Sequence, residues 1–301
     1  MRQLFYKFIY SSSVNLIYRN ILRSVRPNKR WFKKIPVSGN VIFHINGKKF
    51  KVATNQTSYT SRRIFWDGID EFEYVPIFRT LVKKVNTFID IGANTGLYST
   101  LGALENPELK VWGFEPSLGP FTYFEENIKL NKFENQVKAY PIALSNETGK
   151  AIFYELKSEK YKYLNHNLGG VGNLVSKVNN RNMIEITVEV STFDNFLKKH
   201  PEIKDVGLVK MDTEGAEDLV IKGMSQTIQK HRPIIITEVL FGKTEDELEN
   251  LFQDKDYLFF NHIKSKNKLE KTPYISRNDD NGVRDMFLVP KEKLSFVSEF
   301  I

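Results

Sequence analysis

The stretch FIDIGANTGLYS, residues 88–99, decides the fold. It has the pattern of a short apolar strand that contains Asp90 and leads to Gly92. A turn follows, and a helix begins at Gly96. Glycines at such a turn allow the backbone to approach a ligand closely at the N-terminus of the helix. The stretch therefore predicts the first strand–turn–helix unit of a ligand-binding α/β domain, although an ordinary strand-to-helix turn has the same pattern.

The middle position of this turn indicates which ligand to expect. Dinucleotide-binding turns have the form G-x-G-x-x-G, in which the middle glycine lets a pyrophosphate lie against the chain. Here that position is Asn94, whose side chain is tolerable if the ligand has no pyrophosphate. S-adenosylmethionine has none, and its zwitterionic amino acid part can use both a carboxylate such as Asp90 and free backbone N–H groups. We therefore expect S-adenosylmethionine at this turn.

A second acidic residue follows in KVWGFEP, residues 110–116, where Glu115 ends the next predicted strand. A carboxylate at that place can accept hydrogen bonds from both ribose hydroxyls of a cofactor, although solvated acids are also common at strand ends. The two motifs in this order favour an adenosyl cofactor but do not by themselves exclude NAD.

Strands and helices alternate along the chain from residue 86 onward. Apolar runs predict strands at 86–92, 110–116, 136–144, 206–212, 232–240, 257–263 and 285–290. Between them the sequence predicts helices at 96–105, 117–130, 191–199, from about 214, and at 244–254. This rhythm predicts an α/β fold, a Rossmann-like, mostly parallel sheet of seven strands with helices on both faces. Only the region 148–190, with two strand-like runs around the loop HNLGGVGN, and the polar stretch 264–284 depart from it.

The residues before this domain divide into two parts. Residues 1–38 form a basic amphipathic extension with one or two short helices between 3 and 25. Residues 39–85 contain a β-hairpin around Asn46-Gly47 and a helix over 69–84 that Pro76 weakens. We accordingly expect the catalytic domain to occupy residues 86–301.

Charge is distributed unevenly in this chain of 301 residues with net charge +8. Residues 1–66 hold fourteen Lys and Arg and no acidic residue, whereas the remainder holds 30 basic and 36 acidic residues. Nine of these basic residues lie in residues 1–34, interleaved with Phe, Tyr, Leu and Trp, so we expect peripheral contact with an anionic membrane surface there. The alternative is a pair of helices packed on the catalytic domain with a solvated basic face.

The composition also bounds the location and chemistry of the protein. The absence of cysteine excludes disulfides, cysteine-based zinc sites and thiol catalysis. No apolar run reaches the roughly 18 residues of a membrane span, and the N-terminus is a poor signal peptide because Lys7 and Ser11 interrupt its apolar stretch. These features favour a cytoplasmic protein.

Candidate catalytic carboxylates follow two later strands. Asp212 and Glu214 in LVKMDTEGAE come after one strand, and Glu238 ends the next. Open α/β sheets bind ligands at this carboxyl edge, so one carboxylate can take the acceptor's proton while another holds the cofactor's amino group. His166 in the glycine-rich loop is an alternative base if that loop closes over the site. We expect no metal, because a third ligand is not evident, although a Mg²⁺ site on two of these acids is the alternative.

The segments GANTGLYS, GFEP, EENIKLN, IAL, VKMDTEGAE and RPIIITEV together resemble the FkbM family of methyltransferases over roughly residues 86–240. The resemblance implies a class I methyltransferase fold, S-adenosylmethionine as donor, and O-methylation of natural products or sugars. It also implies which residues bind each part of the cofactor. These are Gly92, Ala93, Asn94, Thr95 and Gly96 for the methionine, Glu115 for the ribose, and Ala143 and Leu144 beside the adenine. We also expect Pro116, next to Glu115, to contact the cofactor.

We therefore expect a methyltransferase acting on a hydroxyl of a glycan or small molecule. One alternative is an RNA or protein methyltransferase that docks through the basic arm, but the chain lacks an NPPY-like tetrapeptide, which disfavours nucleic acid. Another is a Rossmann-like binding module without turnover. The intact set of Asp90, Gly92, Gly96, Glu115 and Asp212 disfavours such a module.

Overall fold

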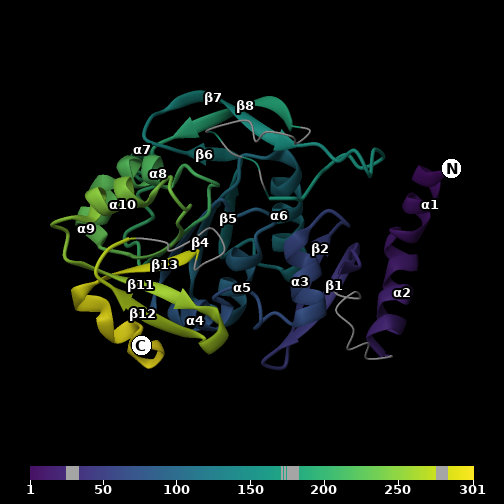
Figure 1. Ribbon diagram of the computed structural model, residues 1–301, viewed down its shortest axis with the longest axis horizontal. Coiled ribbons are helices and arrows are strands. Elements are labelled where there is room, and N and C mark those ends of the chain that lie inside the picture. The colour runs from purple at the N-terminus through teal and green to yellow at the C-terminus, as the bar shows by residue number, and fades with distance from the viewer. Residues whose placement is uncertain (25–33, 171, 173, 175–182, 276–283) are drawn as a thin grey trace.

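The computed structural model describes residues 1–24, 34–170, 172, 174, 183–275 and 284–301. Its centre is an eight-stranded sheet with the order β12-β11-β13-β10-β9-β3-β4-β5 and with helices on both faces (Figure 1). The strands are β3 (Thr87–Ile91), β4 (Lys110–Phe114), β5 (Val137–Tyr140), β9 (Leu208–Met211), β10 (Ile234–Glu238), β11 (Tyr257–Ile263), β12 (Lys268–Thr272) and β13 (Asp285–Pro290). The predicted Rossmann-like α/β fold is therefore confirmed.

Strands β5, β4, β3, β9 and β10 run parallel, whereas β13 is antiparallel to both β10 and β11. The eighth strand, β12, lies in the polar stretch 264–284, where the sequence predicted no strand, so the sheet has one strand more than the seven expected. β12 is an edge strand in which Leu269 alone is buried, and one buried residue produces no recognisable alternation.

Side chains of the parallel strands alternate between two hydrophobic layers. In β3, Phe88 packs in one layer, while Ile89 and Ile91 pack in the other. The first layer is covered by α4 (Val75–Leu81), α5 (Leu97–Glu105) and α6 (Leu118–Asn131). The second is covered by α7 (Phe193–Lys199), α8 (Glu217–Gly223), α9 (Ser225–His231) and α10 (Glu245–Phe252). Short 3₁₀ turns are η2 (Val82–Lys84), η3 (Lys264–Lys266), η4 (Lys291–Phe296) and η5 (Ser298–Phe300).

The single strand predicted over 136–144 is in fact two strands. β5 ends at Tyr140, and β6 (Ile142–Leu144) joins a separate sheet of order β6-β8-β7 with β7 (Gly149–Leu156) and β8 (Met183–Ser191). Pro141 separates them because it has no N–H with which to continue the sheet ladder. The small sheet lies above the carboxyl ends of the central strands (Figure 1).

The hairpin before the central sheet has the predicted turn. β1 (Gly39–Ile45) and β2 (Lys48–Thr54) meet at Asn46-Gly47, and both turn residues have positive φ, as a type I′ turn requires. A helix that the sequence did not predict, α3 (Tyr59–Asp67), follows. The helix predicted over 69–84 begins only at Val75, because Pro76 is tolerated in the first turn of a helix and not in its interior.

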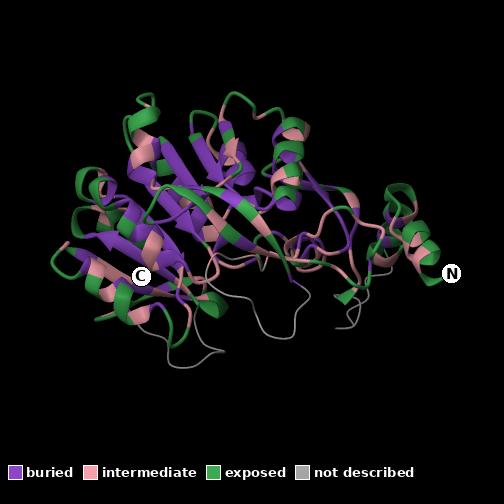
Figure 2. Ribbon diagram, turned by 90° about the horizontal axis from the view of Figure 1, so that it is seen from above, coloured by how far each residue is buried: buried purple, intermediate pink, exposed green. Residues whose placement is uncertain are grey.

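The N-terminal extension forms two short helices, α1 (Arg2–Ile9) and α2 (Ser12–Ser24), as predicted. They lie along the edge of the molecule farthest from the C-terminus and are largely exposed (Figure 2). No helix within the described ranges is long and apolar enough to cross a membrane.

Candidate functional site

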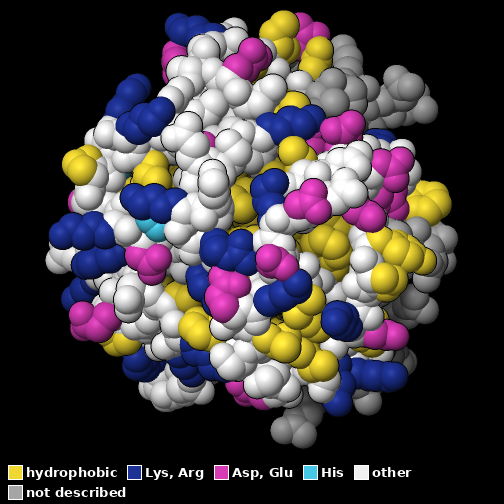
Figure 3. All heavy atoms as spheres, turned by 90° about the vertical axis from the view of Figure 1, so that its left-hand side faces the viewer, with side chains coloured by type: hydrophobic (Ala, Val, Ile, Leu, Met, Phe, Trp, Pro, Cys, Tyr) yellow, Lys and Arg dark blue, Asp and Glu magenta, His cyan; other side chains and the backbone are white. Residues whose placement is uncertain are grey.

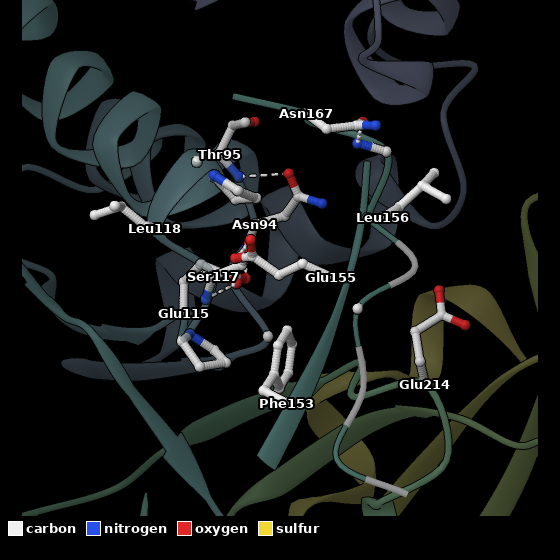
Figure 4. Close-up of a pocket in the computed structure, with 18 of the residues that line it drawn as sticks. Asn94, Thr95, Glu115, Ser117, Leu118, Phe153, Glu155, Leu156, Asn167 and Glu214 are labelled. Atoms are coloured by element: carbon white, nitrogen blue, oxygen red, sulfur yellow. Dashed lines mark hydrogen bonds between the residues drawn. The ribbon is translucent and has the colours of Figure 1, made fainter. Parts of the chain in front are cut away.

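A cavity of about 940 Å³ lies at the carboxyl ends of β3, β4 and β9, below the small sheet (Figure 4). Several predicted site residues line it, namely Gly92, Ala93, Asn94, Thr95, Glu115, Pro116, Ala143, Leu144, His166, Asp212 and Glu214. Asp90, Gly96 and Glu238 are not in its wall. The fold thus brings together residues that are more than a hundred positions apart in the sequence.

The glycines of the turn after β3 serve the packing of the protein itself. Gly92 has φ +67°, and a Cβ there would lie 1.9 Å from the carbonyl oxygen of Asp212. Gly96 has φ +75°, and a Cβ there would lie 2.0 Å from Cδ2 of Phe124 in α6. Both glycines therefore let β9 and α6 approach the turn, which is a different reason from the close ligand approach expected from the sequence.

Asn94 occupies the middle of this turn with φ +52°, a left-handed conformation that Asn tolerates better than most residues. Its side-chain Oδ1 accepts a hydrogen bond from the backbone N–H of Thr95 at 2.8 Å. The backbone N–H of Asn94 donates to Oε2 of Glu115 at 2.8 Å, which connects the turn to the end of β4. The asparagine thus stabilises the turn while leaving its backbone at the cavity wall.

Glu115 is a buried carboxylate at the end of β4. Its Oε1 accepts from the backbone N–H of Ser117 at 2.9 Å, in addition to the bond from Asn94 (Figure 4). Burial raises the pKa of Glu115 to about 7, although these two backbone bonds and Lys210 act in the opposite direction. Each carboxylate oxygen has two acceptor lone pairs, so Glu115 can still accept two further hydrogen bonds from a ligand.

Asp90 lies beneath the turn, where it accepts hydrogen bonds from the N–H and Oγ of Ser99 at 3.1 and 2.7 Å. The buried Nζ of Lys210 lies 3.5 Å from Oδ1 of Asp90 and donates to the carbonyl of Gly92 at 2.8 Å. Burial by itself would lower the pKa of Lys210, but Asp90 and Asp212 raise it, so the lysine is charged. Asp90 therefore supports the turn through Lys210 and Ser99 and does not reach the cavity.

Lys210 is a residue that sequence reasoning missed, and a signal for it was present. A lysine in the middle of VGLVKMD interrupts an otherwise apolar strand. A charged residue at a position that must be buried requires a buried partner of opposite charge. That argument would have paired Lys210 with Asp90 on the neighbouring strand.

Asp212 and Glu214 both face the cavity after β9. The side chain of Asp212 is 46 % exposed toward the cavity, with Oδ2 3.9 Å from Nζ of Lys210. Protein surrounds it on the other sides, and this burial raises its pKa despite the opposing effect of Lys210. Glu214, with φ +56°, lies across the cavity from Asn94 and Glu115 (Figure 4).

Glu238 does not join these two carboxylates in the cavity wall. Its Oε1 lies 3.5 Å from Nη1 of Arg284, and it pairs in register with Asp285 across β10 and β13. Burial raises the pKa of Glu238 to about 8, with further contributions from Asp212 and Glu214. The expected convergence of three carboxylates is thus limited to two, because the last residue of β10 points toward the antiparallel neighbour.

Among the acidic residues that line the cavity without having been predicted are Glu73 and Glu155. Glu73 accepts a hydrogen bond from the hydroxyl of Tyr98 at 2.7 Å, and burial together with Asp285 raises its pKa to about 8. Glu155 on β7 accepts a hydrogen bond from Oγ of Ser117. Neither follows a strand of the central sheet, so no motif marks them, and only tertiary packing places them here.

His166 lies in the segment that covers the start of α6. A Cβ added to Gly119 in α6 would lie 3.1 Å from the Cβ of His166. The carbonyl of His166 accepts a hydrogen bond from Nδ2 of Asn55 at 3.1 Å. The backbone is therefore attached to the protein while the residue lines the cavity. Part of the loop HNLGGVGN falls outside the described residues. Within the described ranges, no three Asp, Glu or His side chains are arranged to hold a metal ion.

The strand order with an antiparallel β13 between β10 and β11, and a cavity at the carboxyl edge of β3 and β4, define a class I methyltransferase fold. Comparison with known proteins adds the family. Residues 90–262, more than half of the chain, match the methyltransferase FkbM domain. The chain belongs to the FkbM methyltransferase family.

Two curated relatives are each 26 % identical to the chain. Methyltransferase sdnD of Sordaria araneosa aligns over 69 % of this chain and 85 % of its own length. Methyltransferase 1 of Beauveria bassiana aligns over 45 % of this chain, which spans 57 % of that protein. Among solved structures, methyltransferase FkbM from Methylobacillus flagellatus KT is 14 % identical, with a TM-score of 0.45 over 77 % of this chain and 54 % of that one.

Proposed function

We propose that this methyltransferase transfers the methyl group of S-adenosylmethionine to a hydroxyl of a glycan or small molecule. One observation carries the proposal: the Asn94–Thr95 turn, the buried carboxylate of Glu115 and the carboxylates of Asp212 and Glu214 line the same cavity. Its volume of about 940 Å³ is at the upper end of that of ligand pockets, so it can hold a cofactor together with a small acceptor.

The residues present fit this cofactor. Glu115 has free acceptor positions for two ribose hydroxyls, and the apolar Ala143, Leu144 and Phe153 offer a wall for an adenine ring. Asp212 lies against Gly92, beside the turn proposed to hold the methionine part. A carboxylate in that position suits the amino group of the methionine.

The cofactor supplies a methyl group on a sulfonium, which is already a strong methylating agent. The chain must therefore position the acceptor oxygen and accept its proton as the new bond to carbon forms. We assign the proton to Glu214, which faces the cavity from the side opposite the turn (Figure 4). His166 is the alternative base, since it lines the same cavity from the segment over α6.

Calorimetry tests the cofactor site. Loss of both ribose hydrogen bonds in Glu115→Ala should cost about 2–4 kcal/mol, or about 30- to 1000-fold in affinity for S-adenosylmethionine. Glu125→Ala, at an exposed position on α6, is the matched control and should bind like the wild type. Binding of NADH but not of S-adenosylmethionine by the wild type would show that the cofactor is wrong.

Methyl transfer from radiolabelled cofactor tests the acceptor class and the roles of the acids. We expect label in sugar or small-molecule fractions, and labelling of RNA or protein alone would contradict the proposal. With an acceptor identified in this way, Glu214→Gln should reduce the single-turnover rate of methyl transfer by about 10²- to 10⁴-fold and leave the affinity for S-adenosylmethionine unchanged. Asp212→Asn should weaken cofactor binding. A rate loss in His166→Ala alone would assign the base to the loop, and sensitivity to EDTA would indicate a metal.

A further inference from the structure

The N-terminal helices expose apolar side chains instead of burying them. On α1, Leu4 and Phe8 are 72 % and 65 % exposed, and Phe5 lies between them. On α2, Ile17 and Ile21 are 62 % and 59 % exposed and lie one helical turn apart. An amphipathic helix that packs on its own domain would turn these side chains inward. Their outward orientation indicates that something outside the described chain covers them.

The side of α2 that faces the protein is polar. Asn15 and Arg19 are buried, and the guanidinium of Arg19 donates to the carbonyls of Ser38 and Asn40. The Oδ1 of Asn15 accepts from the backbone N–H of Ser38 at 2.9 Å. These bonds hold the helix in this orientation, because rotating the apolar side inward would leave buried polar groups without partners. The outward orientation of the apolar side chains is thus fixed by the hydrogen bonds of Asn15 and Arg19.

The charge around this face selects the partner. Arg2, Lys7 and Arg23 are exposed on the two helices, and no acidic residue occurs before Asp67. A second copy of the chain, related by a twofold axis, would bring this cationic patch against itself. The opposite end of the molecule carries acidic and basic side chains intermixed (Figure 3), in contrast to the purely basic charge of residues 1–66.

We propose that α1 and α2 dock the enzyme on an anionic membrane, with their exposed apolar side chains in the bilayer interface and the basic residues at the lipid headgroups. This goes beyond the proposed methyl transfer and does not depend on it. It follows the expectation of membrane contact over the alternative of two packed helices with a solvated basic face, since the face that remains exposed is apolar as well as basic.

Docking at this edge reaches the wall of the cavity. The side chain of Gln3 donates to the carbonyl of Lys160 at 3.0 Å, and the rings of Tyr6 and Tyr10 contact Tyr161 edge-on. The adjoining Lys162 lines the cavity. The two helices are therefore attached to the segment that borders the cavity.

Flotation of the full chain with lipid vesicles tests the docking. We expect binding to phosphatidylcholine vesicles that contain about one third phosphatidylglycerol, weak binding to pure phosphatidylcholine, and release at high salt. The double variants Phe5→Ser/Phe8→Ser and Ile17→Ser/Ile21→Ser should lose binding. Phe241→Ser, at a 45 % exposed position after β10, should not.

Removing two charges in Arg2→Gln/Lys7→Gln should lower the partition coefficient about 25-fold, since each basic residue near the lipid contributes about fivefold. Circular dichroism and thermal unfolding check that the variants fold, and their affinity for S-adenosylmethionine should equal that of the wild type. Equal, salt-insensitive binding to neutral and anionic vesicles would overturn the proposal. The proposal would also be overturned if the wild type were a dimer that does not bind vesicles and the serine variants were monomers.

Discussion

The ionisation of Glu115 should control cofactor affinity between pH 6 and 7.5. Its pKa is raised to about 7 by burial, whereas a hydroxyl of a ribose donates its hydrogen bond best to the ionised carboxylate. With that pKa, about one tenth of the free protein has Glu115 ionised at pH 6 and about three quarters at pH 7.5. The dissociation constant should therefore fall about eightfold between pH 6 and 7.5, or by about 1.2 kcal/mol.

The same shift predicts how stability depends on pH. Between pH 4.5 and 7, Glu115 holds its proton in the folded state but has released it in the unfolded state. The free energy of unfolding should therefore fall as pH rises through this window, by up to about 3 kcal/mol from this group. Other buried acids behave similarly, so the difference between wild type and Glu115→Gln isolates the contribution of Glu115.

Calorimetry of S-adenosylmethionine binding in two buffers of different ionisation enthalpy is the assay. Near pH 6 the wild type should release close to one proton on binding, and this release should be absent in Glu115→Gln. The variant also corrects for titration of the ligand's own amino group. If wild type and variant show the same pH dependence of affinity and the same proton release, the raised pKa of Glu115 or its role at the ribose is wrong.

Two further predictions concern the turn and its support. Gly96→Ala should destabilise the protein by about 1–3 kcal/mol more than Gly47→Ala, because both have φ +75° but only the first places a Cβ into Phe124; equal melting temperatures would contradict this. Lys210→Met should cost about 3–5 kcal/mol in urea unfolding, because it leaves the carboxylate of Asp90 buried without its cation. Adding Asp90→Asn should recover part of the loss, and full stability of the single variant would show that the pair is not important.

The fold could be predicted because its signals are local and repeated. Each parallel strand is a short apolar run, and the residues that follow the runs at Glu115 and Asp212 lie at the same edge of any parallel sheet. Errors arose where one residue changed the geometry or where a strand buried almost nothing. Pro141 divides a predicted strand, and the edge strand β12 buries only Leu269.

The sequence by itself determined the class of fold, the turn at Gly92–Gly96 and the acids at the strand ends, because spacing along the chain sets which residues reach the carboxyl edge. Only the tertiary structure decided which acids share the cavity. Glu73 enters it from a turn before α4, whereas Glu238 is directed toward Arg284 because its strand neighbour runs antiparallel. The orientation of α2 likewise depends on tertiary contacts. Buried hydrogen bonds from Arg19 fix the polar side of the helix toward the protein, so the apolar side chains of α2 face outward although burial would favour the opposite orientation.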